Sequence, residues 1–148
     1  MKVDTEFCVI EKAGLIIRIS FSDVKYTNGR VSEQCYESLK AYTLGNTQEV
    51  NCPIDIVGTP FQQAVLNVVK AIPYGQTMTY KEVAIKAGYD NAFRAVGMVM
   101  KNNRYVIKIP CHRVVAKNHL GGFNGGLKLK ERLLQLEQSK SLTFKESF

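Results

Sequence analysis

Two helix-start signals in the middle of the chain constrain its fold most. The segments TPFQ at residues 59–62 and TYKE at residues 79–82 each place threonine three residues before glutamine or glutamate. This spacing is typical of a capping box, in which both side chains bond free backbone N–H groups of the first helical turn. Proline at the first helical position further favours the first start. With Pro73 to Gly75 as a break and Gly88 as a stop, the sequence predicts two consecutive capped helices.

A third helix is predicted to begin at Asp90 or Asn91 and to run to about Asn102. Its buried face would carry Phe93, Val96 and Met100. Two short helices joined by a tight glycine-containing turn are typical of a helix-turn-helix, whose second helix would contact DNA with Arg94 near its start. Many helical hairpins bind no nucleic acid, so a purely structural role stays open on this pattern alone.

The first 57 residues predict a small α+β unit. The apolar runs FCVI and GLIIRISF flank Gly14 and predict a β-hairpin, and Asn28-Gly29 predicts a further turn. Residues 32–44 predict a helix that Ser32 could cap, and residues 45–57 a linker ending in a short strand. Nothing here indicates chemistry, so we interpret residues 1–57 as a support domain and residues 58–148 as the functional domain.

The chain is basic, with a net charge of +7 and a pI of about 9.3. Such a balance favours a polyanionic partner such as nucleic acid, although a merely soluble basic protein would show it too. No apolar run approaches the roughly 18 residues of a membrane span, and charges interrupt the N-terminal apolar residues, which argues against a signal peptide. We therefore expect a cytoplasmic protein, or a nuclear one if the source is eukaryotic, without membrane association.

The four cysteines have spacings that fit no CxxC or zinc pattern, so no metal site is expected. Without a secretion signal a disulfide framework is unexpected as well. Cys8, Cys35 and Cys52 lie in apolar or unpatterned contexts and are interpreted as buried structural thiols. Cys111 differs because proline precedes it and histidine and arginine follow.

The segment PCHR at residues 110–113 carries the chemistry. It follows residues 105–109, an apolar run that predicts a short strand, and Pro110 would fix a rigid bend at Cys111. A thiolate is the reactive form of cysteine. We expect positive charge on His112 and Arg113 to lower the pKa of the Cys111 thiol, and His112 could also accept its proton, directly or through water.

A histidine base acts better when a third group orients it. The segment LKLKERLLQLEQ predicts a C-terminal helix. On it Glu137 could turn inward toward His112, but the pattern alone favours the solvated side. Between the two lies GGFNGG at residues 121–126, a loop whose glycines permit close approach to a ligand. Phe123 in this loop could stack on a base or simply anchor the loop.

Four blocks of sequence resemble the O6-alkylguanine-DNA alkyltransferase family, also called methylated-DNA–protein-cysteine methyltransferases. These are IPCHRVV at residues 109–115, GTPFQQAVLNVVKAIPYGQTMTYKEVA at residues 58–84, RAVG at residues 94–97 and the glycine loop ending in GGL. They occur in the family's order over about residues 58–137. The resemblance implies an α+β fold with a small, reduced ribonuclease H-like α/β domain. A mostly helical domain would follow, with a helix-turn-helix and a short active-site strand and turn.

The resemblance also implies roles for five reacting or supporting residues. Cys111 would attack the O6-alkyl carbon of guanine and form a stable thioether. His112, oriented by Glu137, would deprotonate the thiol through a water molecule. Tyr80 would rotate a DNA phosphate and donate a proton to the leaving guanine, and Asn103 would brace the active-site turn.

By the same resemblance, the protein would bind the minor groove of double-stranded DNA and flip the alkylated guanine out of the stack. Arg94 would fill the space that the base vacates. The DNA-contacting set would be Thr79, Tyr80, Arg94, Ala95, Gly97 and Lys101.

The implied substrate pocket would be lined by Met100, Val114, Phe123, Asn124 and Lys130. The carbonyl groups of Cys111 and Val114 would read the guanine amino group, and the amide of Asn124 would contact O6. Phe123 replaces a tyrosine that is common in the family, and Lys108 stands where an apolar residue is usual.

The resemblance implies a DNA repair protein that needs no cofactor, acts once because the thioether is not reversed, and works as a monomer. O4-alkylthymine is a further implied substrate. Three alternatives remain: a non-catalytic lesion sensor, a DNA-binding regulator whose Cys111 responds to alkylation, and a cysteine hydrolase that turns over.

Overall fold

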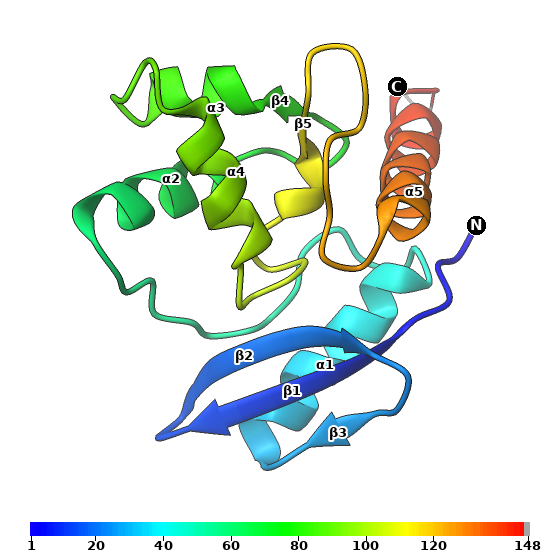
Figure 1. Cartoon of the computed structure of the whole chain (residues 1–148). Helices are drawn as coiled ribbons and strands as arrows, with labels where there is room; N and C mark the ends of the chain where they lie inside the picture. The colour runs from blue at the N-terminus through cyan, green and yellow to red at the C-terminus, as the bar shows by residue number, and fades with distance from the viewer. Residues whose placement is uncertain (147–148) are drawn as a thin grey trace.

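A β-hairpin begins the chain, as the two apolar runs predict. In the computed structural model, which describes residues 1–146, β1 (Glu6–Lys12) pairs antiparallel with β2 (Leu15–Ser22). Ala13 and Gly14 join them with φ angles of 53° and 79°, as a two-residue hairpin turn requires. β3 (Tyr26–Thr27) adds parallel to β1, which gives the strand order β2-β1-β3 (Figure 1).

Helix α1 (Arg30–Thr43) covers this sheet and begins earlier than predicted. Its N-cap is Gly29 and not Ser32. The Ser32 hydroxyl instead reaches back to accept the N–H groups of Asn28 and Gly29, at 3.0 and 2.9 Å. Glu11 of β1 accepts the N–H of Ser32 at 2.8 Å, so a residue distant in sequence satisfies one free N–H group of the first turn.

The expectation that no cysteines pair was wrong. Cys35 of α1 and Cys52 form a disulfide, with their Cα atoms 4.7 Å apart. The segment 45–57 runs back along α1 and so brings Cys52 to Cys35. The two cysteines are 17 residues apart in the sequence, and that spacing alone does not predict their contact. The predicted strand in this segment is also absent among the described residues; its one bond to the sheet is from the N–H of Ile16 to the carbonyl of Pro53, at 2.8 Å.

The next segment contains the two capped helices that the sequence predicts. α2 (Pro60–Lys70) and α3 (Tyr80–Lys86) each begin with a complete capping box, in which Thr59 and Thr79 accept N–H groups at 3.1 Å. β4 (Met78–Thr79) precedes α3 and pairs parallel with β5 (Val114–Val115). This pairing places the start of α3 beside the residues that follow Cys111.

Helix α4 (Phe93–Lys101) differs from the prediction at its start. Its N-cap is Ala92, without a side-chain cap, and neither Asp90 nor Asn91 plays that part. Phe93 was expected in the core but is 46% exposed, because at the first position of the helix its side chain extends beyond the buried stripe. Val96 and Met100 are buried as predicted.

Residues 105–109 do not form the predicted strand. A single bridge joins Tyr105 to Ile19 of β2, after which the backbone turns. Ile107 has a φ of 70°, and the N–H groups of Lys108 and Ile109 bond the carbonyls of Val106 and Tyr105. Val106, Ile107 and Ile109 are buried in this turn.

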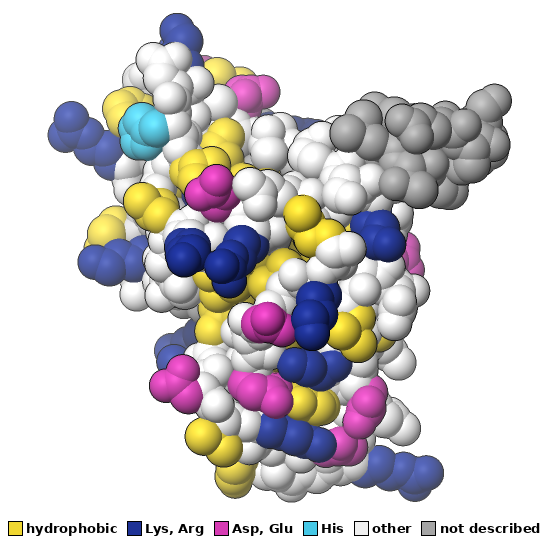
Figure 2. All heavy atoms as spheres, turned by 90° about the vertical axis from the view of Figure 1, so that its right-hand side faces the viewer, with side chains coloured by type: hydrophobic (Ala, Val, Ile, Leu, Met, Phe, Trp, Pro, Cys, Tyr) yellow, Lys and Arg dark blue, Asp and Glu magenta, His cyan; other side chains and the backbone are white. Residues whose placement is uncertain are grey.

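Helix α5 (Leu127–Glu146) contacts both the N-terminal sheet with α1 and the turn that carries Cys111 (Figure 1). One core cluster lies between the sheet and α1 and includes Leu133 and Leu136 of α5. The other lies among α2, α3, α4 and the turn that carries Cys111. Figure 2 shows acidic and basic side chains interspersed over the sheet and α1 side of one face, without a continuous patch of one sign. Among the described residues, no helix combines the length and apolarity needed to cross a membrane.

Candidate functional site

Cys111 lies at the start of a short 3-10 turn, η1 (Cys111–Arg113), and is 4% exposed. Its side chain is nevertheless part of the lining of a cavity of about 560 Å³. The other lining residues come from α3, α4 and the glycine loop and are Tyr80, Gly97, Met100, Lys101, Gly122, Phe123 and Asn124. The thiol is therefore buried in the protein but open to a ligand that enters this cavity.

Asn103 braces the turn that carries the cysteine. Its Nδ2 donates to the carbonyl of Ile109 at 2.9 Å, and its Oδ1 accepts the N–H of Tyr105 at 2.9 Å. A hydrogen bond from Asn103 also favours the thiolate form of Cys111. One side chain thus fixes both ends of the segment 105–109 and touches the sulfur.

Glu137 of α5 points inward and is the centre of a buried network. It accepts His112 Nε2 at 2.7 Å, Arg113 Nε and Nη2 at 2.8 and 2.9 Å, and the N–H of Gly75 at 3.1 Å. The hydroxyl of Tyr42 also donates to it. The side chains of His112 and Glu137 are 0% and 1% exposed. Of the two positions that the sequence left open for Glu137, the structure has the inward one.

The electrostatics of this network keep Glu137 charged and His112 neutral. Burial alone would raise the pKa of Glu137, but hydrogen bonds from His112 and Arg113 outweigh it and hold the pKa far below its usual range. Burial lowers the pKa of His112 despite the nearby carboxylate. A neutral His112 that donates from Nε2 has a free acceptor at Nδ1, and this atom is buried and has no partner in the part of the chain that the structure describes.

The expectation that charge on His112 and Arg113 lowers the pKa of the Cys111 thiol was wrong. Burial raises the pKa of the thiol, and the opposing influences are Asn103 and the charge of Lys130. Arg113 does not serve the sulfur, because its guanidinium is held by Glu137 and by the carbonyl of Ile72 at 2.7 Å. The site therefore holds a thiol that needs a base to ionise it, rather than a standing thiolate.

Lys130 of α5 is fully buried and connects the active-site turn to the glycine loop. Its ammonium donates to the carbonyls of Val114 and Gly122, at 2.6 and 3.0 Å. Burial lowers its pKa to about 8. Val114 is itself fully buried, does not line the cavity, and offers its carbonyl to Lys130.

The glycine loop packs directly against Tyr80. A Cβ atom at Gly121 would lie 2.6 Å from the Tyr80 hydroxyl, and Gly121 has a φ of +76°, so only glycine fits without strain. Burial raises the pKa of Tyr80, which keeps the phenol protonated. Phe123 stacks edge-on against Phe21 of β2 with ring centroids 5.6 Å apart, so the sheet supports the loop.

The residues predicted to contact DNA lie on and beside α4. Arg94, Ala95 and Lys101 are exposed, while Gly97 is half-buried with its Cβ position 4.0 Å from the Tyr80 ring. Thr79 is occupied as the cap of α3. Among residues 1–146, no group of histidine, cysteine and carboxylate side chains could hold a metal ion.

Sequence reasoning missed three partners of Glu137: Tyr42, Arg113 and the N–H of Gly75. Tyr42 comes from α1, 95 residues before Glu137, and no local pattern marks it. Arg113 was noticed but was assigned to the wrong partner. Arg113 follows His112 directly in the sequence. Two neighbouring residues of a tight turn can both contact the same helix, and this could have predicted that Arg113 also binds Glu137.

The sequence and fold of this chain are similar to those of one known protein family. Residues 60–139 match the family model described as 6-O-methylguanine DNA methyltransferase, DNA binding domain. The chain belongs to this family. The methylated-DNA–protein-cysteine methyltransferase of Mycobacterium tuberculosis strain H37Rv is 38% identical over 134 residues, covering 78% of this chain and 81% of that protein. The homologue from Methanosarcina barkeri is 39% identical over 113 residues, covering 76% and 72%.

The structural likeness to members of the O6-methylguanine methyltransferase family spans nearly the whole chain. The M. tuberculosis protein in complex with DNA superimposes with a TM-score of 0.77 at 30% identity, covering 91% of this chain and 94% of that one. The O6-methylguanine DNA methyltransferase of Methanococcus jannaschii gives a TM-score of 0.62 at 29% identity, covering 93% and 92%. The mixed α+β fold predicted from the sequence is thereby confirmed.

Proposed function

We propose that this protein repairs DNA by moving an alkyl group from O6 of guanine irreversibly to its own Cys111. The observation that carries the proposal is that Cys111 lines a cavity and is followed in the chain by a buried, neutral His112 that donates to Glu137. A cavity of about 560 Å³ lies within the size range of small-ligand sites and can hold a purine.

The residues around the cavity support an in-line transfer. His112 Nδ1 accepts the thiol proton through a water molecule, and Glu137 balances the charge that His112 gains. The sulfur then attacks the alkyl carbon, and a C–S bond forms as the C–O6 bond breaks. The guanine leaves with the electron pair and takes a proton from Tyr80. The thioether has no route back, so each molecule acts once and needs no cofactor.

The pocket offers groups that would recognise the base. Phe123, fixed by Phe21, presents a ring for stacking, and Met100 forms an apolar wall. The amide of Asn124 would contact O6, while the carbonyl of Cys111 would read the amino group. Lys130 keeps the Val114 carbonyl and the glycine loop in place. O4-alkylthymine is a further substrate of this proposal.

The second half of the chain would bind duplex DNA. Residues 58–148 carry 14 Lys and Arg against 5 Asp and Glu, whereas residues 1–57 carry 6 against 8. All of the positive excess thus lies on the half that contains α3, α4 and Cys111. We assign α3 and α4 as a helix-turn-helix that enters the minor groove. Arg94 would replace the flipped guanine, and Thr79, Ala95, Gly97 and Lys101 would adjoin the backbone.

In this proposal the chain divides near residue 57. The first part, a reduced ribonuclease H-like unit, supports the site through Tyr42 and Phe21. The second part binds DNA and reacts. The protein would act as a monomer in the compartment that holds the DNA.

The deciding experiment incubates the protein with a duplex that carries one O6-methylguanine and then measures the intact protein mass. We expect a gain of one methyl group per molecule, located on Cys111 by peptide mapping. Cys111→Ala should gain nothing, and Cys8→Ala, which removes the other free thiol, should react normally. A second round of repair by the same molecule would instead show a hydrolase, and an unmodified protein would show a sensor or regulator.

A further inference from the structure

A second cavity lies on the other side of the active-site turn. It encloses about 660 Å³ and shares no lining residue with the Cys111 cavity. Three segments form it: residues 48–50 with Tyr42, residues 70–74 after α2, and residues 107–113 of the turn. Its volume falls in the range of small-molecule sites. The proposed alkyl transfer makes no use of this space.

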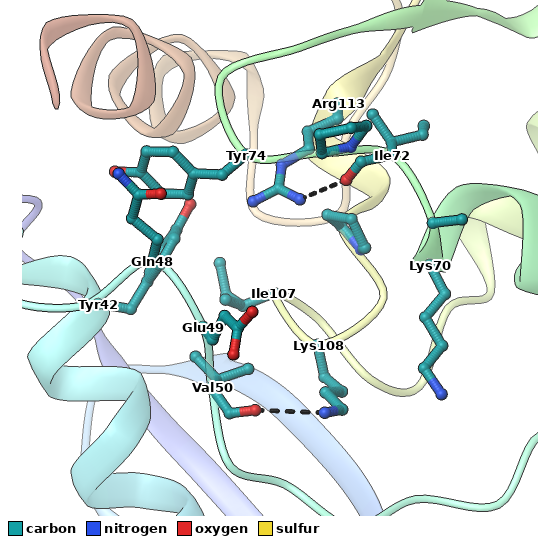
Figure 3. A pocket seen from close by; sticks show the side chains of 13 residues that line it. Tyr42, Gln48, Glu49, Val50, Lys70, Ile72, Tyr74, Ile107, Lys108 and Arg113 are labelled. Atoms are coloured by element: carbon teal, nitrogen blue, oxygen red, sulfur yellow. Dashed lines mark hydrogen bonds between the residues drawn. The ribbon is translucent and has the colours of Figure 1, made fainter. Parts of the chain in front are cut away.

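One end of this cavity is cationic. Figure 3 shows Lys70 and Lys108 at the end away from the tyrosines. The ammonium of Lys108 is half-buried, and its described hydrogen bond goes to the carbonyl of Val50 at 3.2 Å, which leaves two of its three donors unused. Among residues 1–140, whose side chains the structure describes, neither lysine has a carboxylate oxygen within ion-pair distance.

The charges at this end are not balanced by the protein. Burial lowers the pKa of Lys108, and the charge of Lys70 lowers it further, so the two ammonium groups repel each other across the cavity. Glu49 is the lone carboxylate among the lining residues and offsets one of them in part. The third cation, Arg113, is neutralised by Glu137. An anion placed between the lysines would remove this repulsion.

The other end is aromatic and carries hydrogen-bonding groups. Tyr74, Tyr42 and Gln48 gather there in Figure 3, away from the two lysines. The hydroxyl of Tyr74 is buried and has no hydrogen-bond partner in the described part of the chain. The amide of Gln48 belongs to an exposed residue and could read the edge of a heterocycle. The cavity therefore offers a cationic end that can bind an anion and an aromatic end that can bind a ring.

We propose that this cavity binds a nucleoside monophosphate or a phosphate ester of similar size, with its phosphate between Lys70 and Lys108 and its ring toward Tyr74 and Gln48. Because Ile107, Lys108 and Pro110 form part of the wall, the ligand would contact the segment that leads directly to Cys111. The site is separate from the pocket for the alkylated guanine and does not depend on the proposed transfer reaction.

The test titrates adenosine monophosphate, inorganic phosphate and adenosine into isotopically labelled protein and follows the backbone amides by NMR. Adenosine monophosphate should shift the amides of residues 48–50 and 107–108 saturably, and more tightly than the other two probes. Lys108→Met and Lys70→Met should each weaken binding about tenfold, the loss of one charge-assisted hydrogen bond. Lys12→Met, which removes an exposed lysine outside the cavity, should change nothing.

The proposed site would be refuted if adenosine monophosphate caused no saturable shifts, or if its shifts were confined to α4. It would also be refuted if both lysine variants bound adenosine monophosphate as tightly as the unchanged protein. Equal affinities for adenosine monophosphate and phosphate would overturn the nucleotide assignment, since the aromatic end would then contribute nothing. Lys70 is exposed and has no described side-chain contact, so its variant keeps the test valid if Lys108→Met disturbs the turn. Methyl transfer by each variant serves as the measure of intact folding.

Discussion

The guanidinium of Arg113 grips the carboxylate of Glu137 with two hydrogen bonds, at 2.8 and 2.9 Å, in a site closed to solvent. This pair joins the turn that carries the nucleophile to the C-terminal helix. It also fixes the carboxylate oxygen that His112 contacts at 2.7 Å. The orientation of the base therefore depends on an arginine that does not touch the sulfur.

Replacing Arg113 with methionine should destabilise the protein by about 3–5 kcal/mol, because Glu137 would remain charged in a buried site without its main partner. The rate of methyl transfer should fall as well, since the carboxylate that orients His112 would move. Urea unfolding and single-turnover kinetics measure the two effects. Arg132→Met, at an exposed position of α5, is the matched control and should alter neither. An equal loss in both variants would refute the structural importance of the pair.

Acid should destabilise the protein through His112 and Glu137. The pKa of His112 is lowered in the folded state, so below its ordinary value near 6.5 the unfolded chain binds a proton that the folded protein does not. The pKa of Glu137 is lowered too, so its contribution is present above its ordinary value near 4.5 and is lost as the pH falls further. The melting temperature should therefore fall from pH 7 toward pH 4. His112→Asn should flatten the upper part of this fall, and an unchanged profile would contradict the assignment.

Phe93→Ala should weaken repair of duplex DNA by about tenfold while leaving reaction with free O6-methylguanine base unchanged. Phe93 is 46% exposed, starts the helix that we assign to the minor groove, and lies under the Arg94 guanidinium at 6.0 Å. An aromatic ring there can stack on bases that base flipping disturbs. Ile17→Ala, at an exposed apolar position on β2, is the control. Equal losses on duplex and free base would show instead a general effect on the pocket.

Gly121→Ala should slow transfer and lower the melting temperature, whereas Gly122→Ala should leave the melting temperature unchanged. A Cβ atom at Gly121 would collide with the Tyr80 hydroxyl, and the positive φ adds strain of about 1–3 kcal/mol. At Gly122 a Cβ atom would meet nothing within 4 Å. Because Gly122 lines the Cys111 cavity, the melting temperatures and not the transfer rates give the matched comparison. Indistinguishable variants would mean that the loop does not pack on Tyr80 in solution.

The fold could be predicted from sequence where local chemistry decides it. The capping boxes at Thr59 and Thr79 specify their helix starts through hydrogen bonds within one turn, and both predictions were confirmed. The start of α1 was misplaced because the N–H of Ser32 bonds Glu11, which is distant in sequence, and the Ser32 hydroxyl accepts the N–H of Gly29. The strand expected at residues 105–109 failed because periodicity reports burial and not the φ of Ile107.

The site residues likewise include some that local sequence predicts and one that it does not. Cys111 and His112 could be identified because proline, cysteine and histidine stand together in the chain. The inward position of Glu137 could not, because a charged residue on an amphipathic helix usually faces water. Only the arrival of Tyr42, Gly75 and Arg113 from three other segments makes burial of that charge favourable.

The bond between Cys35 and Cys52 simplifies how the chemistry can be followed. With those two sulfurs oxidised, a thiol-specific dye can react only with Cys8 and with Cys111. Loss of one equivalent of dye uptake after exposure to lesion-bearing DNA would then report the spent fraction of a preparation, without radioactivity and without digestion.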